Sequence, residues 1–215
     1  PEGKTVFTGN PRATEVMHGN AEAGRGFLGV DAGKKIVLIF GGSRGARAIN
    51  EAVLSVVTEL GKYADTHFVY VTGDVHFDKI SSELAAKGKL PENISVLPFV
   101  HNMPDVLAAT HILVGRAGAS TLAEVTALGV PSILIPSPYV TNNHQEKNAR
   151  GLERAGAARV IVEKELRGER LLQEVESLLH SDELWKQMKE SALSLGMPKA
   201  ATEIVRTLQE VSAKK

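Results

Sequence analysis

Short apolar runs alternate with helical patterns along most of this chain, and this alternation restricts the fold more than any other feature. Strand-like apolar runs lie at 36–40, 67–72, 94–99, 111–114, 132–135 and 159–162. Helical patterns lie between them, at 46–60, 77–87, 104–107, 120–128 and 143–155. Strands separated by helices are typical of a parallel sheet that is buried on both faces. The sequence therefore predicts an α/β fold in which ligands bind beyond the carboxyl ends of the strands.

The chain from residue 168 onward has helical periodicity only. Leu171, Val175 and Leu178 fall on one helical face, and Leu208 and Val211 fall on another further along. We expect these terminal helices to cover the sheet rather than extend it, with Gly-Met-Pro at 196–198 as a joint between them. Whether the last helix, at about 199–211, packs on this domain or on a missing one is left open by the sequence. Residues before 36, including Gly-Asn-Pro at 9–11, are expected to form a loop. No internal repeat or linker divides the chain, so residues 1–215 are predicted to form one domain.

The composition excludes several classes of protein. The 25 basic residues balance 25 acidic ones, which gives no sign of a nucleic-acid-binding surface. The chain has no cysteine, so disulfides, thiolate metal sites and a cysteine nucleophile are excluded. No apolar run approaches the roughly 20 residues that cross a bilayer, and we expect a soluble chain. The sequence starts at Pro1 without a methionine, and we expect it to be a piece of a longer protein.

The first candidate ligand site is the segment GGSRGA at 41–46, which follows a predicted strand and opens a helix. Backbone N–H groups and the positive end of the helix could hold a diphosphate there, with Ser43 as a hydroxyl donor. The segment matches neither the P-loop nor the dinucleotide-binding fingerprint. A tight turn in which the glycines permit close packing and Ser43 only caps the helix is an equally good interpretation.

The second candidate lies between Gly115 and Glu124. Small residues at a strand-to-helix turn, Gly118 and Ala119, allow a ligand to approach the backbone, and Glu124 offers two acceptor oxygens to paired hydroxyls. The spacing of Thr121 and Glu124 also fits a capping box, in which Glu124 would only stabilise the helix start. The pattern alone favours that cap, whereas a helix that starts nearer Ala119 would leave Glu124 free.

The third candidate is the polar cluster that follows the strand at 132–135. Asn142, Asn143, His144, Gln145 and Asn148 could read sugar hydroxyls through their side chains, and Gln145 and Asn148 share a helix face. A solvated loop in which Asn142 or Asn143 caps the helix is equally compatible with the pattern. The seven histidines are scattered and show no metal-binding spacing, so a metal site is not predicted.

Taken together, these motifs resemble the C-terminal, donor-binding half of the MurG family of glycosyltransferases. Their sequences are most similar to those of Bacillus-type members. The resemblance covers essentially all 215 residues. It depends on five ordered motifs: TGNP at 8–11, GGSRGA at 41–46, RAGA at 116–119 through Glu124, GVP at 129–131, and His144-Gln145 with Asn148.

The resemblance implies roles for individual residues around UDP. Glu124 would accept hydrogen bonds from the ribose hydroxyls, which replaces the capping-box interpretation. The Val100 backbone, beside Phe99, would hold uracil, and Met103 would line the nucleotide pocket.

For the rest of the donor, the resemblance implies that Ser43 and the helix start near Ala119, Ser120 and Thr121 face the diphosphate. Arg116 would close that region, and Gln145 and Asn148 would read N-acetylglucosamine. Two positions depart from the family pattern. His144, which would also contact the sugar, stands where many members have glutamine. Arg12, which with Asn10 would contact the nucleotide, comes one position earlier than in some relatives.

The resemblance also implies a fold and a reaction. The fold would be the Rossmann-like, doubly wound C-terminal half of a GT-B enzyme, and the N-terminal acceptor domain, which supplies the general base, is expected to be outside this chain. The full enzyme would transfer N-acetylglucosamine from UDP-N-acetylglucosamine to lipid I with inversion, forming lipid II in peptidoglycan synthesis.

The resemblance also implies what the protein binds and where it acts. No metal is expected in this domain, since no D-x-D motif is present. No other cofactor is expected, and no catalytic residue is expected here because the general base would lie in the N-terminal domain. Donor binding without transfer is expected of the chain alone. The full protein is expected to sit peripherally on the cytoplasmic face of the plasma membrane, with lipid I and other cell-wall synthesis proteins as partners. A UDP-N-acetylglucosamine 2-epimerase of the same shape and a non-catalytic nucleotide-sugar sensor remain the alternatives.

Overall fold

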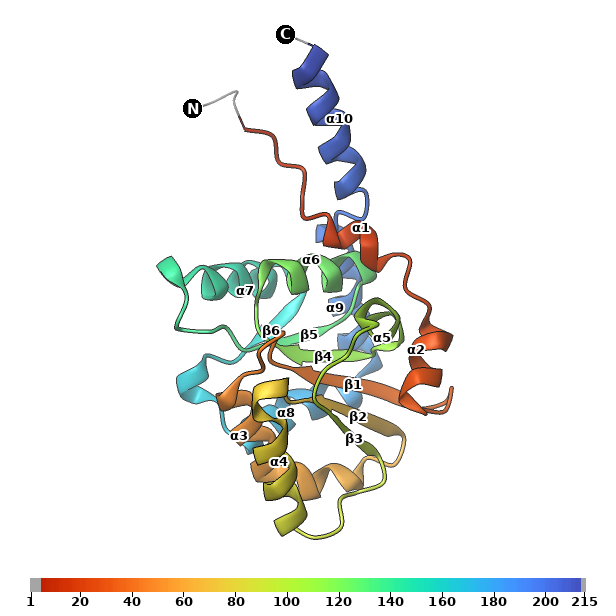
Figure 1. The fold of residues 1–215 in the computed structure, drawn as a ribbon, viewed down its shortest axis with the longest axis vertical. Helices are drawn as coiled ribbons and strands as arrows, with labels where there is room; N and C mark the ends of the chain where they lie inside the picture. Colours follow the sequence, from red (N-terminus) through yellow and green to blue (C-terminus); the bar gives the residue numbers. More distant parts are fainter. Residues whose placement is uncertain (1–4, 214–215) are drawn as a thin grey trace.

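The computed structural model describes residues 5–213, and a parallel six-stranded sheet runs through its centre (Figure 1). Residues 1–4 and 214–215, the ends of the predicted domain, lie outside the described residues. The strands are β1 Lys35–Phe40, β2 Thr66–Val71, β3 Ile94–Leu97, β4 Ile112–Gly115, β5 Ser132–Leu134 and β6 Ala158–Val160. Their order is β3-β2-β1-β4-β5-β6, and every neighbouring pair is parallel. The predicted doubly wound α/β fold is confirmed.

The central strands are apolar throughout because helices cover both faces of the sheet. Along β1, Val37 and Ile39 point into one core, whereas Ile36, Leu38 and Phe40 point into the other. This alternation follows from the two-residue repeat of a strand. Each of these five side chains is at most 8% exposed. The strand therefore reads as a continuous apolar run rather than an alternating one.

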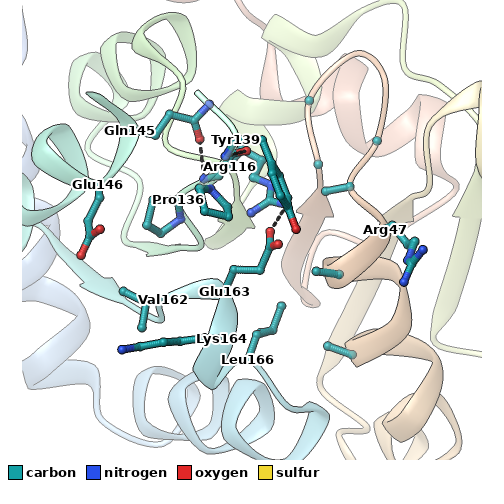
Figure 2. Close-up of a pocket in the computed structure, with 18 of the residues that line it drawn as sticks. Arg47, Arg116, Pro136, Tyr139, Gln145, Glu146, Val162, Glu163, Lys164 and Leu166 are labelled. Carbon is teal, nitrogen blue, oxygen red and sulfur yellow. Dashed lines mark hydrogen bonds and ion pairs between the residues drawn. The ribbon is translucent and has the colours of Figure 1, made fainter. Parts of the chain in front are cut away.

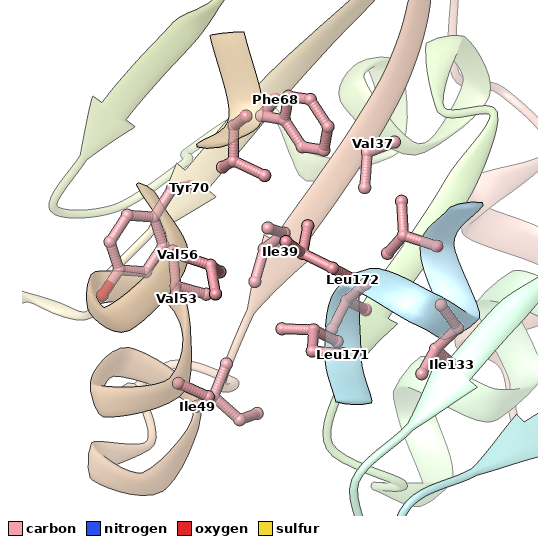
Figure 3. Packing of buried hydrophobic residues seen from close by; sticks show 14 of the residues in the cluster. Val37, Ile39, Ile49, Val53, Val56, Phe68, Tyr70, Ile133, Leu171 and Leu172 are labelled. Atoms are coloured by element: carbon pink, nitrogen blue, oxygen red, sulfur yellow. The ribbon is translucent and has the colours of Figure 1, made fainter. Parts of the chain in front are cut away.

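Helices from the middle and the end of the chain cover the first face. They are α3 Arg47–Val56, continued by the 3-10 turn η1 Val57–Lys62, then α4 Asp74–Ala86 and α8 Gly168–Leu179. Figure 3 shows Ile49 and Val53 of α3 and Leu171 and Leu172 of α8 packed around Ile39. Gly168 permits this close approach, because a Cβ there would lie 2.5 Å from a side-chain carbon of Val56.

The other face is covered by α1 Arg12–Val16, α2 Ala21–Leu28, α5 Met103–Ala109 and α6 Ala119–Leu128. The helices α1 and α2 lie in the segment predicted to be a loop, so that prediction is wrong. Both are short, and α2 contains two glycines, which lowers helix propensity. The residues at its two ends could have predicted the helix from the sequence. Asn20 Oδ1 caps the start by accepting from Glu22 N and Ala23 N, and Gly29 ends the helix in the left-handed conformation.

The terminal helices behave differently from one another. Both α8 and α9 Asp182–Leu195 pack on the domain as predicted, and residues 196–199 join α9 to α10 Ala200–Ala213. In contrast, α10 projects away from the sheet (Figure 1). Ala200 at its start is 1% exposed, whereas Leu208 is 65% exposed. The prediction that the terminal helices cover the sheet thus holds for α8 and α9, whereas the last helix, whose packing the sequence left open, does not cover it.

The strand order reverses between β1 and β4, and the loops after these two strands open at the same edge of the sheet. The segment 41–46 follows β1, and Arg116 to Gly118 follow β4. Reversal points of this kind create a crevice in which α/β proteins bind ligands. The topology thus brings the first and second candidate segments together.

Candidate functional site

A cleft of about 1540 Å³ opens at this edge of the sheet (Figure 2). Its walls come from four loops that follow strands and from the starts of the helices after them. The lining residues are 41–48, 51, 52, 55, 116, 118, 121, 136–139, 143, 145, 146, 150 and 162–168. Polar and charged side chains alternate with glycine and proline along these walls. The cleft can therefore admit a large, polar ligand.

The loop at 41–46 forms one wall, and its glycines are required by the backbone. Gly45 has φ +72, and a Cβ there would lie 2.1 Å from the carbonyl oxygen of Thr72. Asn50 Nδ2 donates to the same oxygen at 3.1 Å. Ser43 is exposed and lines the cleft. The interpretation of Ser43 as a helix cap is wrong, because the N-cap of α3 is Ala46 and no side chain caps it.

The start of α6 forms the opposite wall. Its N-cap is Gly118 and its first residue is Ala119, so Thr121 lies inside the first turn and the capping-box interpretation is wrong. No side chain caps this helix end. Gly118 and Thr121 line the cleft, and Glu124 is three residues further on the same helix face. Ala119 and Ser120 are exposed beside them.

Glu124 is 4% exposed and is paired with Arg12 of α1. Arg12 Nε donates to Glu124 Oε1 at 2.7 Å, and Arg12 Nη2 lies 2.6 Å from the same oxygen. Burial raises the pKa of the Glu124 carboxyl, and the hydrogen bond from Arg12 opposes that rise. A carboxylate in this position has a strong tendency to accept hydrogen bonds, since solvation is limited.

The residues predicted to hold the nucleoside lie around α1 and α5 and do not line the cleft. Val100 is 2% exposed and shares a core cluster with Ala13 of α1, while Met103 packs on that cluster. Phe99 is 37% exposed, and its ring meets His101 edge-on at 5.0 Å. Asn10 Oδ1 accepts from the backbone N–H of Arg12 at 3.0 Å.

The polar cluster after β5 divides between the cleft and the solvent. Gln145 lines the cleft, and its Oε1 accepts from the backbone N–H of Ser137 at 2.9 Å. Asn148 is exposed and does not line the cleft, and His144 is exposed with Nδ1 3.0 Å from Thr141 O. Asn143 occupies the N-cap of α7 His144–Arg154 in a left-handed conformation, but its side chain does not cap the helix. Of this cluster, Gln145 is best placed for a ligand in the cleft.

Arg116 is held at the base of the cleft by two acceptors. Its Nη1 donates to Ile135 O at 3.1 Å, and its Nη2 pairs with Glu163, as Figure 2 shows. The side chains of both ion-pair partners are about 13–14% exposed. Glu163 was not predicted from the sequence, nor was Tyr139, which is 85% exposed on the loop after β5. Both follow the carboxyl end of a strand, and that position is the signal that could have found them.

Comparison with known proteins agrees with this geometry. Residues 36–204 match the family model described as glycosyltransferase family 28 C-terminal domain. The chain belongs to this family. A family 28 relative from Halalkalibacterium halodurans is 52% identical over 99% of the chain. Its name is UDP-N-acetylglucosamine--N-acetylmuramyl-(pentapeptide) pyrophosphoryl-undecaprenol N-acetylglucosamine transferase. The chain covers 58% of that relative's length.

Solved structures extend the likeness of this family 28 domain. The crystal structure of Acinetobacter baumannii MurG matches with a TM-score of 0.72 and 26% identity, over 92% of this chain and 55% of that one. The resemblance to the MurG family is thus confirmed. UDP-GlcNAc 2-epimerase from Neisseria meningitidis matches with a TM-score of 0.65 at 17% identity, over 98% of this chain and 56% of that one. The epimerase likeness shows a shared fold only.

Two further observations concern the described part of the chain. Within residues 5–213, no three His, Asp or Glu side chains gather closely enough to hold a metal ion. None of the helices described is long and apolar enough to cross a membrane.

Proposed function

We propose that this family 28 domain binds UDP-N-acetylglucosamine and that the complete protein transfers N-acetylglucosamine to lipid I, forming lipid II. The observation that carries the proposal is the position of Glu124. It is a buried carboxylate one turn beyond the uncapped helix start that lines the cleft. The family membership favours the transferase over the epimerase and sensor alternatives.

The diphosphate would lie between the 41–46 loop and the start of α6. Both helices that begin there, α3 and α6, lack a side-chain cap, so their first N–H groups can donate to phosphate oxygens. Ser43 would add a hydroxyl donor, and Arg116 would add positive charge at the base of the cleft. Negative charge develops on the diphosphate as UDP leaves, and preorganised donors stabilise such charge. This arrangement supports a reaction without a bound metal ion.

The nucleoside would extend from the diphosphate toward α5. Glu124 would accept from the ribose hydroxyls, since a carboxylate has acceptor sites for both. The backbone of Val100 would pair with uracil, with Phe99 and Met103 beside it. The common cluster of α1, α5 and α6 supports this placement, because it contains Val100 and Met103 together with Ala123 and Val125, the neighbours of Glu124 on α6.

The sugar would lie toward α7. The hydrogen bond from Ser137 fixes Gln145 through Oε1, which leaves the Nε2 donors of the amide for a sugar hydroxyl or carbonyl oxygen. Asn148 and His144 are exposed outside the cleft and would need a change of conformation to contribute. The sugar is therefore proposed to depend on Gln145 first.

The transfer itself needs the rest of the protein. The C4 hydroxyl of the acceptor would attack the anomeric carbon, UDP would leave from the opposite side, and the configuration would invert. The base that takes the hydroxyl proton is proposed to lie in an N-terminal acceptor domain. Because the acceptor is anchored to undecaprenol, the complete protein would work at the cytoplasmic face of the plasma membrane, near other cell-wall synthesis proteins.

Titration calorimetry on this chain tests the donor site. UDP and UDP-N-acetylglucosamine should bind, and Glu124→Ala should weaken both by at least about tenfold, because a hydrogen bond to a charged group is lost. Incubation with lipid I and donor should give no lipid II. If neither nucleotide binds at millimolar concentration, or if Glu124→Ala binds like the wild type, the proposed site is wrong.

A further inference from the structure

We propose that Arg12 is a positioning residue for nucleotide recognition, which holds Oε1 of Glu124 so that Oε2 remains available to the ribose hydroxyls. The inference deepens the proposed function and rests on it. It assigns Arg12 a role through Glu124 rather than a contact with the nucleotide.

The geometry of the pair is asymmetric. Two nitrogens of Arg12, Nε and Nη2, converge on Oε1 of Glu124 at 2.7 and 2.6 Å. Oε2 has no hydrogen-bond partner among residues 5–213, yet it is not one of the fully buried unpartnered atoms. Oε2 therefore keeps some exposure and has its acceptor sites unused within the described residues. A structural ion pair between arginine and carboxylate usually engages both oxygens, one to each nitrogen.

Arg12 is itself fixed from both sides. Its Nη1 lies 2.7 Å from Glu15 Oε2, one turn along α1, and its backbone N–H donates to Asn10 Oδ1. The guanidinium is planar, so holding Nη1 on Glu15 also sets the direction of Nε and Nη2. A short hydrogen-bonded chain thus links Asn10, Arg12 and Glu15 to Glu124. This chain of contacts gives a physical reason why an arginine follows Gly-Asn-Pro.

The pair also controls the charge of Glu124. Burial raises the pKa of this carboxyl, and Arg12 is the group that lowers it. Glu15 opposes Arg12 weakly. The charged groups of the other helices packed on α6 do not contact the Glu124 carboxyl. Asp105, the charged residue of α5, accepts a hydrogen bond from Asn20 N. Helix α9 contacts α6 at its far end, where Leu193 lies beside Gly129. Without Arg12, Glu124 would take up a proton more easily and would lose acceptor capacity.

The test compares UDP with 2′-deoxy-UDP by titration calorimetry on this chain. The ratio of their dissociation constants isolates the ribose hydroxyl, and titration of the terminal phosphate affects both ligands alike. In the wild type, UDP should bind about tenfold or more tightly than 2′-deoxy-UDP. Arg12→Met should reduce the ratio to about threefold or less, with a smaller ratio at pH 6 than at pH 8. Arg12→Lys, which keeps the charge but not the two-nitrogen contact, should restore part of the ratio.

The matched control is Arg206→Met, which removes an exposed arginine paired with Glu203 on α10. It should keep the wild-type ratio. The inference is overturned if Arg12→Met keeps the wild-type ratio. An unchanged ratio with weaker binding of both ligands would mean that Arg12 acts elsewhere on the nucleotide. A wild-type ratio of one also overturns it. A complete lack of UDP binding by the wild type would instead overturn the proposed function itself.

Discussion

The imidazole of His111 stacks on the indole of Trp185, with ring centroids 4.5 Å apart and planes 8° from parallel. Trp185 Nε1 also donates to the backbone carbonyl of His111 at 2.9 Å. The pair joins the start of β4 to α9, whereas the cleft is lined by segments that follow the carboxyl ends of the strands. His111 Nε2 is buried without a hydrogen-bond partner in the described chain. A proton on this ring would be poorly solvated.

This contact predicts a pH dependence of stability. Burial, with a smaller contribution from Lys35, lowers the pKa of His111 to about 4. The unfolded chain therefore takes up the proton at a higher pH than the folded one, and stability falls as pH drops from about 6.5 to 4. Because the residue is partly exposed, we expect a contribution of about 1 to 2 kcal/mol. Urea denaturation at several pH values should show a shallower pH dependence for His111→Gln; identical slopes would contradict the prediction.

A second prediction separates the residues proposed to read the sugar. Gln145→Glu keeps the acceptor for Ser137 N but removes the amide donors. UDP-N-acetylglucosamine should lose about tenfold more affinity than UDP, because only the sugar needs the amide donors, whereas the added negative charge acts on the diphosphate of both ligands. Asn148→Ala is the matched control and should change neither affinity, because Asn148 lies outside the cleft. Calorimetry with both ligands measures this, and a sugar-specific loss in Asn148→Ala would show that α7 moves on binding.

A third prediction concerns the loop after β1. Gly45→Ala would place a Cβ 2.1 Å from Thr72 O in a left-handed conformation. We expect a loss of about 3 kcal/mol or more in the free energy of unfolding, measured by urea denaturation. Gly42→Ala is the comparison, since Gly42 also has positive φ but a Cβ there meets no atom within 4 Å. It should cost only about 1 to 2 kcal/mol. Equal losses would mean that the contact with Thr72 does not constrain the loop.

The fold could be predicted largely from periodicity, because the six strands are buried on both faces and lie between amphipathic helices. The short helices α1 and α2 were missed, since each has few apolar positions and is stabilised by contacts that are distant in sequence. Gly24, for example, lets α2 approach the backbone of Asp105. The position of α10 could not be predicted, because an apolar helix face does not reveal what covers it.

The candidate site could be located from the sequence, but its internal geometry could not. The segments after β1, β4 and β5 were predicted to meet, and the cleft confirms that they do. The start of α6 was ambiguous because Thr121 and Glu124 fit a capping box as well as a free carboxylate. Only the backbone decides between these registers. The pairing of Arg12 with Glu124 joins residues 112 positions apart, and local spacing carries no signal for such a contact.

The last prediction tests whether the start of α6 receives the ligand. Gly118 has φ −70, and a Cβ there meets no atom within 4 Å, so Gly118→Ala should cost at most about 1 kcal/mol of stability as a poorer N-cap. The methyl group would nevertheless enter the cleft where the diphosphate is proposed to approach the helix N–H groups. UDP should therefore bind about tenfold more weakly or worse. Gly26→Ala, at an exposed position of α2 that is also free of contacts, should raise stability by about 1 kcal/mol and leave UDP affinity unchanged. Calorimetry and thermal denaturation of both variants measure the two effects, and wild-type affinity in Gly118→Ala would place the diphosphate away from α6.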